Sequence, residues 1–123
     1  VVLRDGRPEI ALGSAGSNRI RSAILQTILG VVDHGLAAQE AVSSPRIHVE
    51  GRDVEAEPGV DEEALAKLEQ SDWTVRRWAE QNLFFGGVQA VARNPESGDI
   101  KVYFDNMKEP VMTAVLFAAW KRA

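Results

Sequence analysis

The chain has 123 residues, of which 45% are hydrophobic and 26% are charged, and its formal net charge is -4. This length suffices for one buried core, so we expect a single domain over residues 1–123, or a fragment of one. The acidic balance offers no basic surface for nucleic acid or anionic lipid, and the absence of cysteine excludes disulfides, thiolate nucleophiles and cysteine-ligated metals.

The first residues are predicted to form a β-hairpin. Two short apolar runs flank Asp5-Gly6, a dipeptide suited to the positive φ angles of a tight turn. The chain begins with Val1 instead of methionine and shows no segment that resembles a signal peptide, so its natural start is expected to lie upstream or to have been removed.

A long helix is predicted between Asn18 and His34. Apolar residues recur there every three or four positions, and Gly35 is placed to end the helix in a left-handed conformation. Because Leu25 and Leu29 make the other side apolar as well, we expect this helix to be packed on two sides.

The remaining elements indicate an α+β fold with mostly antiparallel strands. A short second helix must stop near Pro45, two alternating strands follow it, and residues 60–72 form an amphipathic helix that buries Val60, Leu65 and Leu68. Three further strands are predicted from the segments WTVRRWA, GGVQAVARNP and DIKVYFD, and a turn over residues 94–98 joins the last two. The tail, residues 111–123, is apolar enough to form either a strand or a docked helix.

Neither a membrane span nor a metal site is expected. Residues 23–32 and 110–119 are the longest nearly uncharged runs, and each has half of the roughly 20 residues that a membrane helix needs. His34 is explained as a polar cap near a helix C-terminus, and His34 and His48 without cysteine do not suggest a metal site. No cofactor is implied.

A loop of small residues, Gly-Ser-Ala-Gly-Ser at residues 13–17, leads into the long helix. Small residues let the backbone approach a ligand, and the amides of the first helical turn point outward as donors. Such a loop could hold a phosphate, a carboxylate or the oxyanion that forms when a carbonyl is attacked. The alternative is a tight turn in which Ser17 or Asn18 caps the helix.

Several motifs, taken in order, resemble those of the gamma-glutamyltranspeptidases. GSAGSNRI, ILQTILGVVDHGLAAQEAVSSPRIH, VDEEALAKLEQSDWTV and FFGGVQAVARNPESGDIKVYFDNMKEP are similar to consecutive segments of that family and cover residues 1 to about 106. The resemblance implies the C-terminal portion of the family's small subunit, within the four-layer αββα sandwich of an N-terminal nucleophile hydrolase. The expected sheet is mostly antiparallel with flanking helices.

The resemblance also implies a reaction. In the family, self-cleavage exposes a threonine whose hydroxyl attacks the gamma-glutamyl amide of substrates such as glutathione, and the acyl-enzyme passes to water or an amino acid. That threonine and the family's paired serines would lie upstream of Val1, and Ser43-Ser44 is not that pair. No catalytic residue is therefore expected in this chain.

Two neighbouring glycines of the family supply oxyanion-hole amides and correspond to Gly16 and Ser17, which are our candidate substrate-binding residues. A serine still offers its backbone amide, but its side chain restricts φ and takes up space. Ala15 stands where proline is usual, and Asn18 where serine is usual. These departures suggest a divergent member with another preferred acyl group or with little activity.

Other conspicuous residues favour structural roles. Arg46 is expected to tie loops to carbonyls and carboxylates, and His48 to have a structural role beside it. Gly86-Gly87 indicates a place where the backbone passes close to another element. Asp105 and its neighbour, residue 106, receive no role because the proline and arginine of the family's motif are missing here.

The charged and aromatic candidates are also interpreted structurally. Glu62 and Glu63 are expected to be solvated acids of a first helical turn and not a catalytic pair. Trp73, Trp78 and Trp120 are expected to be core or interface anchors.

Two hypotheses from different classes follow. In the first, the chain is part of a gamma-glutamyl acyltransferase or hydrolase, inactive alone, with the remainder of that protein as its partner and a small gamma-glutamyl compound as substrate. In the second, it is a non-catalytic structural or binding module. The isolated piece is expected to oligomerise through uncovered apolar faces, with residues 111–120 as a contact. The sequence does not indicate a compartment, although members of the family are often exported.

Overall fold

The computed structural model of the chain describes residues 1–105. The predicted tail, with its choice of strand or helix, its contact at residues 111–120 and the anchor Trp120, lies outside the described residues, as does position 106.

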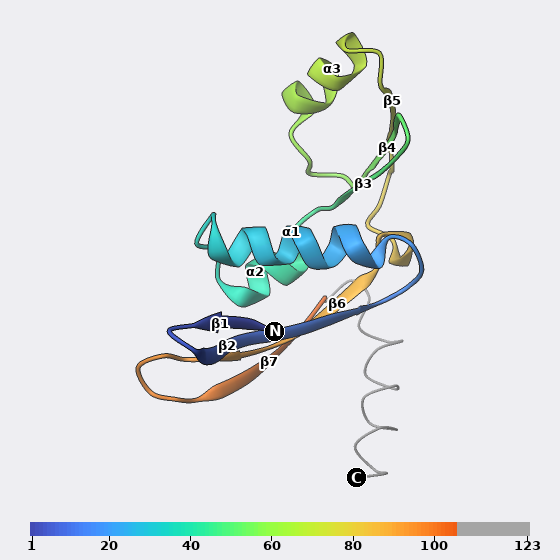
Figure 1. The fold of residues 1–123 in the computed structure, drawn as a ribbon. Coiled ribbons are helices and arrows are strands. Elements are labelled where there is room, and N and C mark those ends of the chain that lie inside the picture. Colours follow the sequence, from blue (N-terminus) through green and yellow to red (C-terminus); the bar gives the residue numbers. More distant parts are fainter. Residues whose placement is uncertain (106–123) are drawn as a thin grey trace.

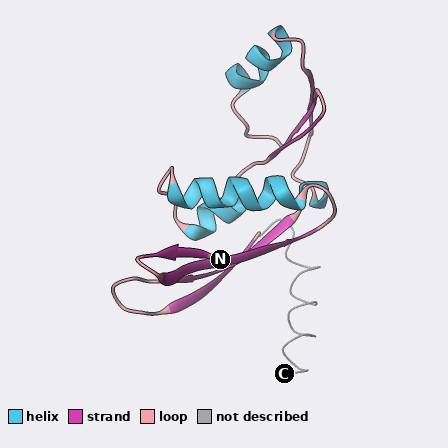
Figure 2. Ribbon diagram, viewed as in Figure 1, coloured by secondary structure: helices cyan, strands magenta, loops and turns pink. Residues whose placement is uncertain are grey.

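A four-stranded antiparallel sheet, here called sheet A, forms the base of the structure. Its strands are β1 (Val2–Arg4), β2 (Arg7–Ala15), β6 (Gly87–Arg93) and β7 (Ile100–Phe104), in the order β1-β2-β6-β7 (Figures 1 and 2). Asp5 and Gly6 join β1 to β2 with φ angles of 51° and 75°, which confirms the predicted hairpin turn.

Helices α1 (Ile20–Val32) and α2 (Ala38–Ser43) cover one face of sheet A (Figure 1). Gly35 follows α1 with a φ of 66°, as predicted. A Cβ atom at Gly30 would lie 3.1 Å from the Cβ of Ala41, so this glycine lets α2 approach closely. The buried residues between helices and sheet form one apolar cluster: Ile10, Ala23, Val42, Val88 and Ala90.

A three-stranded sheet, sheet B, stands on the other side of α1 (Figure 1). It comprises β3 (Ile47–Glu50), β4 (Asp53–Ala56) and β5 (Thr74–Arg77), and α3 (Glu62–Gln70) packs against it. The pair β3–β4 is antiparallel, whereas β4 and β5 are parallel because the chain returns through α3. Among the described residues, this is the exception to an otherwise antiparallel arrangement.

Sheet B and α3 enclose a second apolar cluster. It contains Val54, Ala56 and Leu65, with Val60, Leu68 and Trp73 packed around it, so the predicted inward face of α3 is confirmed. The buried apolar side chains of residues 1–105 thus form two clusters in place of the one core that the chain length suggested.

Charged side chains fasten α3 to β5. Arg77 donates to Glu62 and to Glu69 at 2.8 Å each. The bond to Glu69 lowers the pKa of that carboxyl group, and the bonds to Glu69 and Glu62 together raise the pKa of Arg77. Glu63 pairs with Lys67 one turn along the helix. The exposed positions of Glu62 and Glu63 in the first turn confirm that they are solvated acids.

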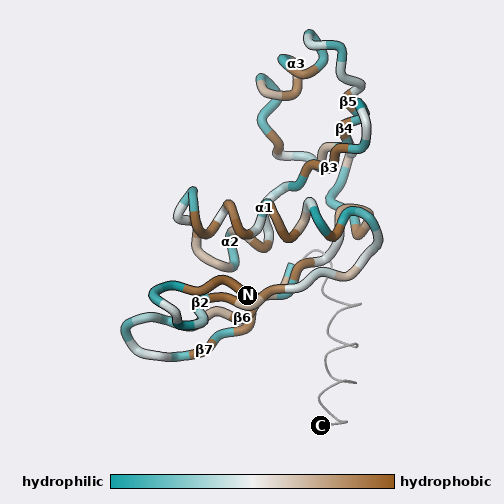
Figure 3. Tube along the Cα trace, viewed as in Figure 1, coloured by the Kyte–Doolittle hydropathy of each residue, from teal (hydrophilic) through white to brown (hydrophobic). Residues whose placement is uncertain are grey.

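The expectation that α1 is packed on two sides is wrong for one stripe of the helix. Leu25, Leu29 and Val32 are 56%, 37% and 52% exposed among the described residues, although the helix is hydrophobic over most of its length (Figure 3). The outer face of sheet A likewise exposes Val91 and Val102. Periodicity shows that a face is apolar, but it does not show that a neighbour covers that face.

Candidate functional site

The loop that connects β2 to α1 contains the two candidate residues. Gly16 has a φ of 139°, in the region that only glycine enters readily, while Ser17 is not among the non-glycine residues with positive φ in residues 1–105. Of the two positions, 16 and 17, serine therefore occupies the one whose backbone conformation an L-residue adopts without strain. The expected restriction of φ at residue 17 has no structural cost here.

The amides of Gly16 and Ser17 have no acceptors among the described residues. Ser17 accepts a hydrogen bond at its carbonyl from the amide of Ile20 at 3.1 Å, but within residues 1–105 the N–H groups of Gly16 and Ser17 donate to no protein atom. The N-cap of α1 is Arg19, without a side-chain hydrogen bond, and the first turn has no acidic residue. The alternative in which Ser17 or Asn18 caps the helix is therefore wrong, because the N-cap is Arg19 and no side chain caps the helix.

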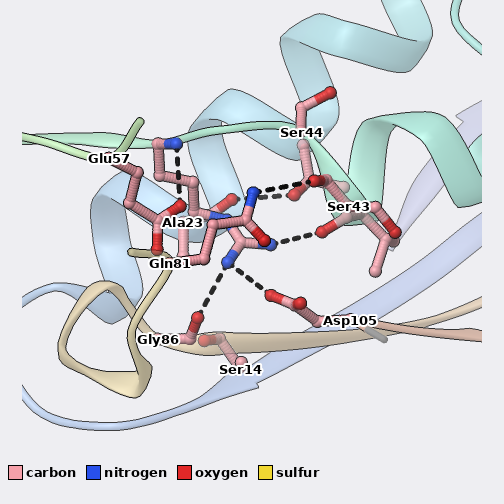
Figure 4. Close-up of polar contacts among 12 residues, drawn as sticks. Ser14, Ala23, Ser43, Ser44, Glu57, Gln81, Gly86 and Asp105 are labelled. Atoms are coloured by element: carbon pink, nitrogen blue, oxygen red, sulfur yellow. Dashed lines mark hydrogen bonds and ion pairs between the residues drawn. The ribbon is translucent and has the colours of Figure 1, made fainter. Parts of the chain in front are cut away.

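A second glycine turn, at Gly86, packs against this loop. Gly86 has a φ of 84°, and a Cβ atom there would lie 2.7 Å from Ser14 Oγ and 3.3 Å from the carbonyl oxygen of Ala15. A Cβ at Gly16 would in turn lie 3.6 Å from the Cα of Gly86. The close backbone approach predicted at Gly86-Gly87 is confirmed, and Figure 4 shows Gly86 beside Ser14.

Arg46 holds this turn from the interior of the molecule. Its side chain is 2% exposed and donates through Nη1 to the carbonyl of Gly86 at 2.8 Å and to Asp105 Oδ2 at 2.7 Å, and through Nη2 to the carbonyl of Val42 (Figure 4). The arginine thus joins the end of α2, the glycine turn and the residue after β7. The structural role predicted for Arg46 is confirmed.

Glu57 completes this buried network. It accepts at Oε2 from the backbone amide of Arg46 and at Oε1 from that of Asn82, each at 3.0 Å. Sequence reasoning missed Glu57 and gave Asp105 no role. Nothing in the sequence marks Glu57: it follows β4 directly, and its burial, which makes donors necessary for the carboxylate, is seen only in the structure.

His48 has a structural position as well. It is buried, and its Nδ1 lies 2.8 Å from the hydroxyl of Ser22 on α1, while Nε2 lies 3.9 Å from Glu50. His34 is exposed just beyond α1. The two histidines are not brought together, and the described residues contain no group of three or more His, Asp or Glu suited to a metal ion.

Three aromatic rings lie at the start of α1. Trp78, Phe84 and Phe85 have centroids 4.6 to 5.4 Å apart, and Phe84 and Phe85 belong to a short 3-10 helix, η1 (Leu83–Phe85). The guanidinium carbon of Arg19 lies 3.4 Å from the centroid of Phe84. With Trp73 in the cluster of sheet B, the anchoring roles predicted for Trp73 and Trp78 are confirmed.

Two cavities among the described residues lie at the far end of β2. They have volumes of about 330 and 280 Å³ and share Pro8 and Glu9 in their linings. The length of β2 separates this end from Gly16 by about 27 Å, at the usual rise per strand residue. Within residues 1–105, no helix is long and apolar enough to cross a membrane.

Solved structures share this fold. An acivicin-inhibited gamma-glutamyltranspeptidase superposes with a TM-score of 0.77 and 26% identity, covering 89% of this chain and 58% of its own. Cephalosporin acylase from Bacillus halodurans matches with a TM-score of 0.74 and 21% identity over 83% of this chain and 19% of its own, which shows the fold alone. The chain thus shares its fold with these transpeptidase and acylase structures.

Sequence relatives narrow the class. The family model described as gamma-glutamyltranspeptidase matches residues 1–115, so the chain belongs to the gamma-glutamyltranspeptidase family. Acylase ACY 1 proenzyme of Pseudomonas sp. strain SE83 is 35% identical over 78% of the chain, and the glutathione hydrolase proenzyme of Bacillus subtilis subsp. natto is 30% identical over 82%. The chain spans 17% of the length of each of these two relatives. These matches do not favour the non-catalytic module.

Proposed function

We propose that this chain forms the oxyanion side of the active site in a gamma-glutamyltranspeptidase-type acyltransferase or hydrolase. The observation that carries the proposal is that, within residues 1–105, the amides of Gly16 and Ser17 have no acceptor, at the start of a helix with no acidic first turn. Backbone donors fixed in advance at the place where negative charge develops give a large catalytic benefit.

The chemistry divides between this chain and a threonine outside it. The threonine Oγ attacks the carbonyl carbon of the acyl donor, its proton passes to the threonine's own amino group, and the carbonyl oxygen becomes an oxyanion that the two amides stabilise. Collapse of this intermediate expels the amine, which takes up the proton. Water or an amino acid then releases the acyl group from the threonine by the same steps.

The described threonines do not fit the nucleophile's role. Thr27 is 1% exposed and donates its hydroxyl to the carbonyl of Ala23 at 2.9 Å, and Thr74 lies within β5. Neither has the free α-amine that such a nucleophile uses as its base. The proposal therefore assigns the nucleophile to the remainder of the protein, which is the partner of this chain.

The proposed acyl donor is a small gamma-glutamyl amide such as glutathione. One of the relatives named above is a glutathione hydrolase and the other is an acylase. The side chain of Ser17 is exposed at the loop and would lie near the bound acyl group, so the choice between these donors is tested at this residue.

The same proposal explains the uncovered face of sheet A. Val91 and Val102, which are paired on neighbouring strands, are 40% and 53% exposed on a sheet whose other face is covered by helices. A second sheet from the remainder of the protein would bury them and complete the αββα sandwich.

The amide of Ser17 is tested directly in the complete processed protein. Ser17→Pro removes the backbone N–H, so we expect kcat for a chromogenic gamma-glutamyl anilide to fall by about 10²- to 10³-fold. Ser17→Ala keeps the amide and is the matched control, with kcat close to that of the unaltered protein. Ser17→Gly is expected to raise turnover of the gamma-glutamyl anilide relative to that of a cephalosporin acyl amide.

Two outcomes would contradict the proposal. One is full activity in Ser17→Pro. The other is a fully processed protein that releases the acyl group from neither substrate.

A further inference from the structure

Arg19 occupies an unusual place for an arginine. It is the N-cap of α1, where Ser, Thr, Asp and Asn are strongly preferred, and it puts a cation at the positive end of the helix dipole. Within residues 1–105 its side chain makes no ion pair and no hydrogen bond, and its Nε is buried without a partner. Arg19 therefore gives the helix no capping hydrogen bond, and its positive charge is unfavourable beside the partial positive charge of the helix N-terminus.

Among the described residues, the specific contact of the Arg19 side chain is with the face of an aromatic ring. The guanidinium carbon lies 3.4 Å from the centroid of Phe84, the geometry of a stacked cation–π pair. The flat face of the guanidinium makes this contact without using its N–H donors. A favourable contact of this kind is of the same order as the unfavourable charge at the helix end, so stability alone gives little reason for an arginine here.

Phe84 is a rigid support. Its amide donates to the side chain of Asn82 at 2.9 Å, and its ring packs on Trp78 at a centroid distance of 4.6 Å. The indole Nε1 of Trp78 donates to Glu55 at 2.7 Å, which fixes the indole ring to β4. The amide of Gly86 donates to the carbonyl of Leu83, so the ring and the glycine turn belong to one short hydrogen-bonded segment.

The loop of Gly16 and Ser17 is thus held at both ends by the segment 82–86. Gly86 supports the incoming end at Ser14 and Ala15, and Phe84 supports the outgoing end through Arg19. The intervening residues 16–18 carry the free amides.

We propose that Arg19 is a positioning residue, which fixes the amides of Gly16 and Ser17 by stacking on Phe84. The inference rests on the proposed function for its catalytic consequence, but the positioning itself can be measured without turnover. Misplacement of reacting groups by about 1 Å can cost as much as 10²-fold in rate, so a looser loop has a measurable effect.

The test uses the complete processed protein with Arg19→Gln, Arg19→Lys, Phe84→Leu and the double variant Arg19→Gln/Phe84→Leu. The matched control is Arg21→Gln, which removes an equal charge from the same helix end. The side chain of Arg21 is exposed, and within residues 1–105 its one hydrogen bond is to the carbonyl of Asn18 at 3.3 Å. Amide hydrogen exchange is followed in the peptide over residues 13–20, with the peptide of α3 as the internal reference. Kinetics use the gamma-glutamyl anilide.

In Arg19→Gln we expect faster exchange in residues 13–20 and a kcat lower by roughly 10- to 100-fold, with KM within about two-fold and exchange in α3 unchanged. Arg19→Lys recovers part of the loss because an ammonium also binds an aromatic face. The double variant is no worse than the more affected single variant, since both changes break one contact. Arg21→Gln behaves as the unaltered protein.

The inference is overturned if residues 13–20 exchange at unaltered rates in Arg19→Gln, if the effects of Arg19→Gln and Phe84→Leu add, or if Arg21→Gln loses as much. If Arg19→Gln loses protection from hydrogen exchange throughout the protein, the test is made with Arg19→Lys instead. That variant must then show faster exchange in residues 13–20 and unaltered exchange in α3. If the unaltered protein has no turnover, the proposed function fails, and hydrogen exchange still decides the role of Arg19.

Discussion

Arg46 shows how a buried charge is made tolerable in this fold. An ionised side chain out of water is very costly unless it is paired and its donors are used. Here the guanidinium meets one carboxylate and two backbone carbonyls, and every one of these acceptors comes from a different element. The residue is therefore part of the mechanical support of the glycine turn.

Removal of this charge is expected to be strongly destabilising. Arg46→Met takes away the cation that faces the buried carboxylate of Asp105, so the free energy of unfolding should fall by about 3–5 kcal/mol in urea titrations of the protein. The control is Arg52→Met, which removes an exposed pair with Asp72 and should change the midpoint little. Similar midpoints for the two variants would contradict a supporting role for Arg46.

At the scale of single residues, sequence reasoning identified chemistry but not partners. The expectation that Arg46 binds carbonyls and a carboxylate follows from its donor set. Two of its acceptors, however, lie 40 and 59 residues away, and no local pattern reports such distances. For the same reason, the partners of Glu57 and the stacking of Arg19 on Phe84 could not be predicted from the sequence.

At the scale of elements, the glycine turn and the end of β2 act as one unit. The turn can lie against Ser14 because residue 86 has no side chain and a φ of 84°. Helices and strands with a clear period were predicted from the sequence at nearly their observed bounds. Helix η1 was not, because three consecutive apolar residues, Leu-Phe-Phe, contain no period to read.

Gly86→Ala is expected to displace the turn. A methyl group there would approach Ser14 Oγ to 2.7 Å and would also adopt an unfavourable φ, so a stability loss of about 1–3 kcal/mol should accompany faster exchange of the loop amides. Gly35→Ala is the matched control, because Gly35 has a φ of 66° and open space around it. If thermal denaturation showed equal losses for both, crowding at Gly86 would be unimportant.

At the scale of the whole molecule, the described residues leave two apolar surfaces without cover. One is the stripe of α1 formed by Leu25, Leu29 and Val32, and the other is the outer face of sheet A. Exposed apolar surface of this kind marks interfaces. The sequence predicted that such apolar faces exist. It could not show which of these faces would be buried by other parts of the chain.

The isolated 123-residue chain is accordingly expected to self-associate. Val91→Lys/Val102→Lys, which places charges on the outer face of sheet A, should shift sedimentation profiles towards smaller species. Thr74→Lys adds a charge to an exposed position of sheet B and should leave the profile unchanged. If the unaltered chain sediments as a monomer, the expected self-association is contradicted.

The backbone at Gly16 and Ser17 also bears on how this family diversifies. Only glycine suits the first position, with its φ of 139°, whereas the second accepts any residue that retains a backbone N–H. A side chain is thus costly at residue 16 and compatible with the backbone at residue 17, which the proposed function places beside the acyl donor. Under that proposal, a substitution at residue 17 would change the surroundings of the acyl group and leave both backbone donors in place.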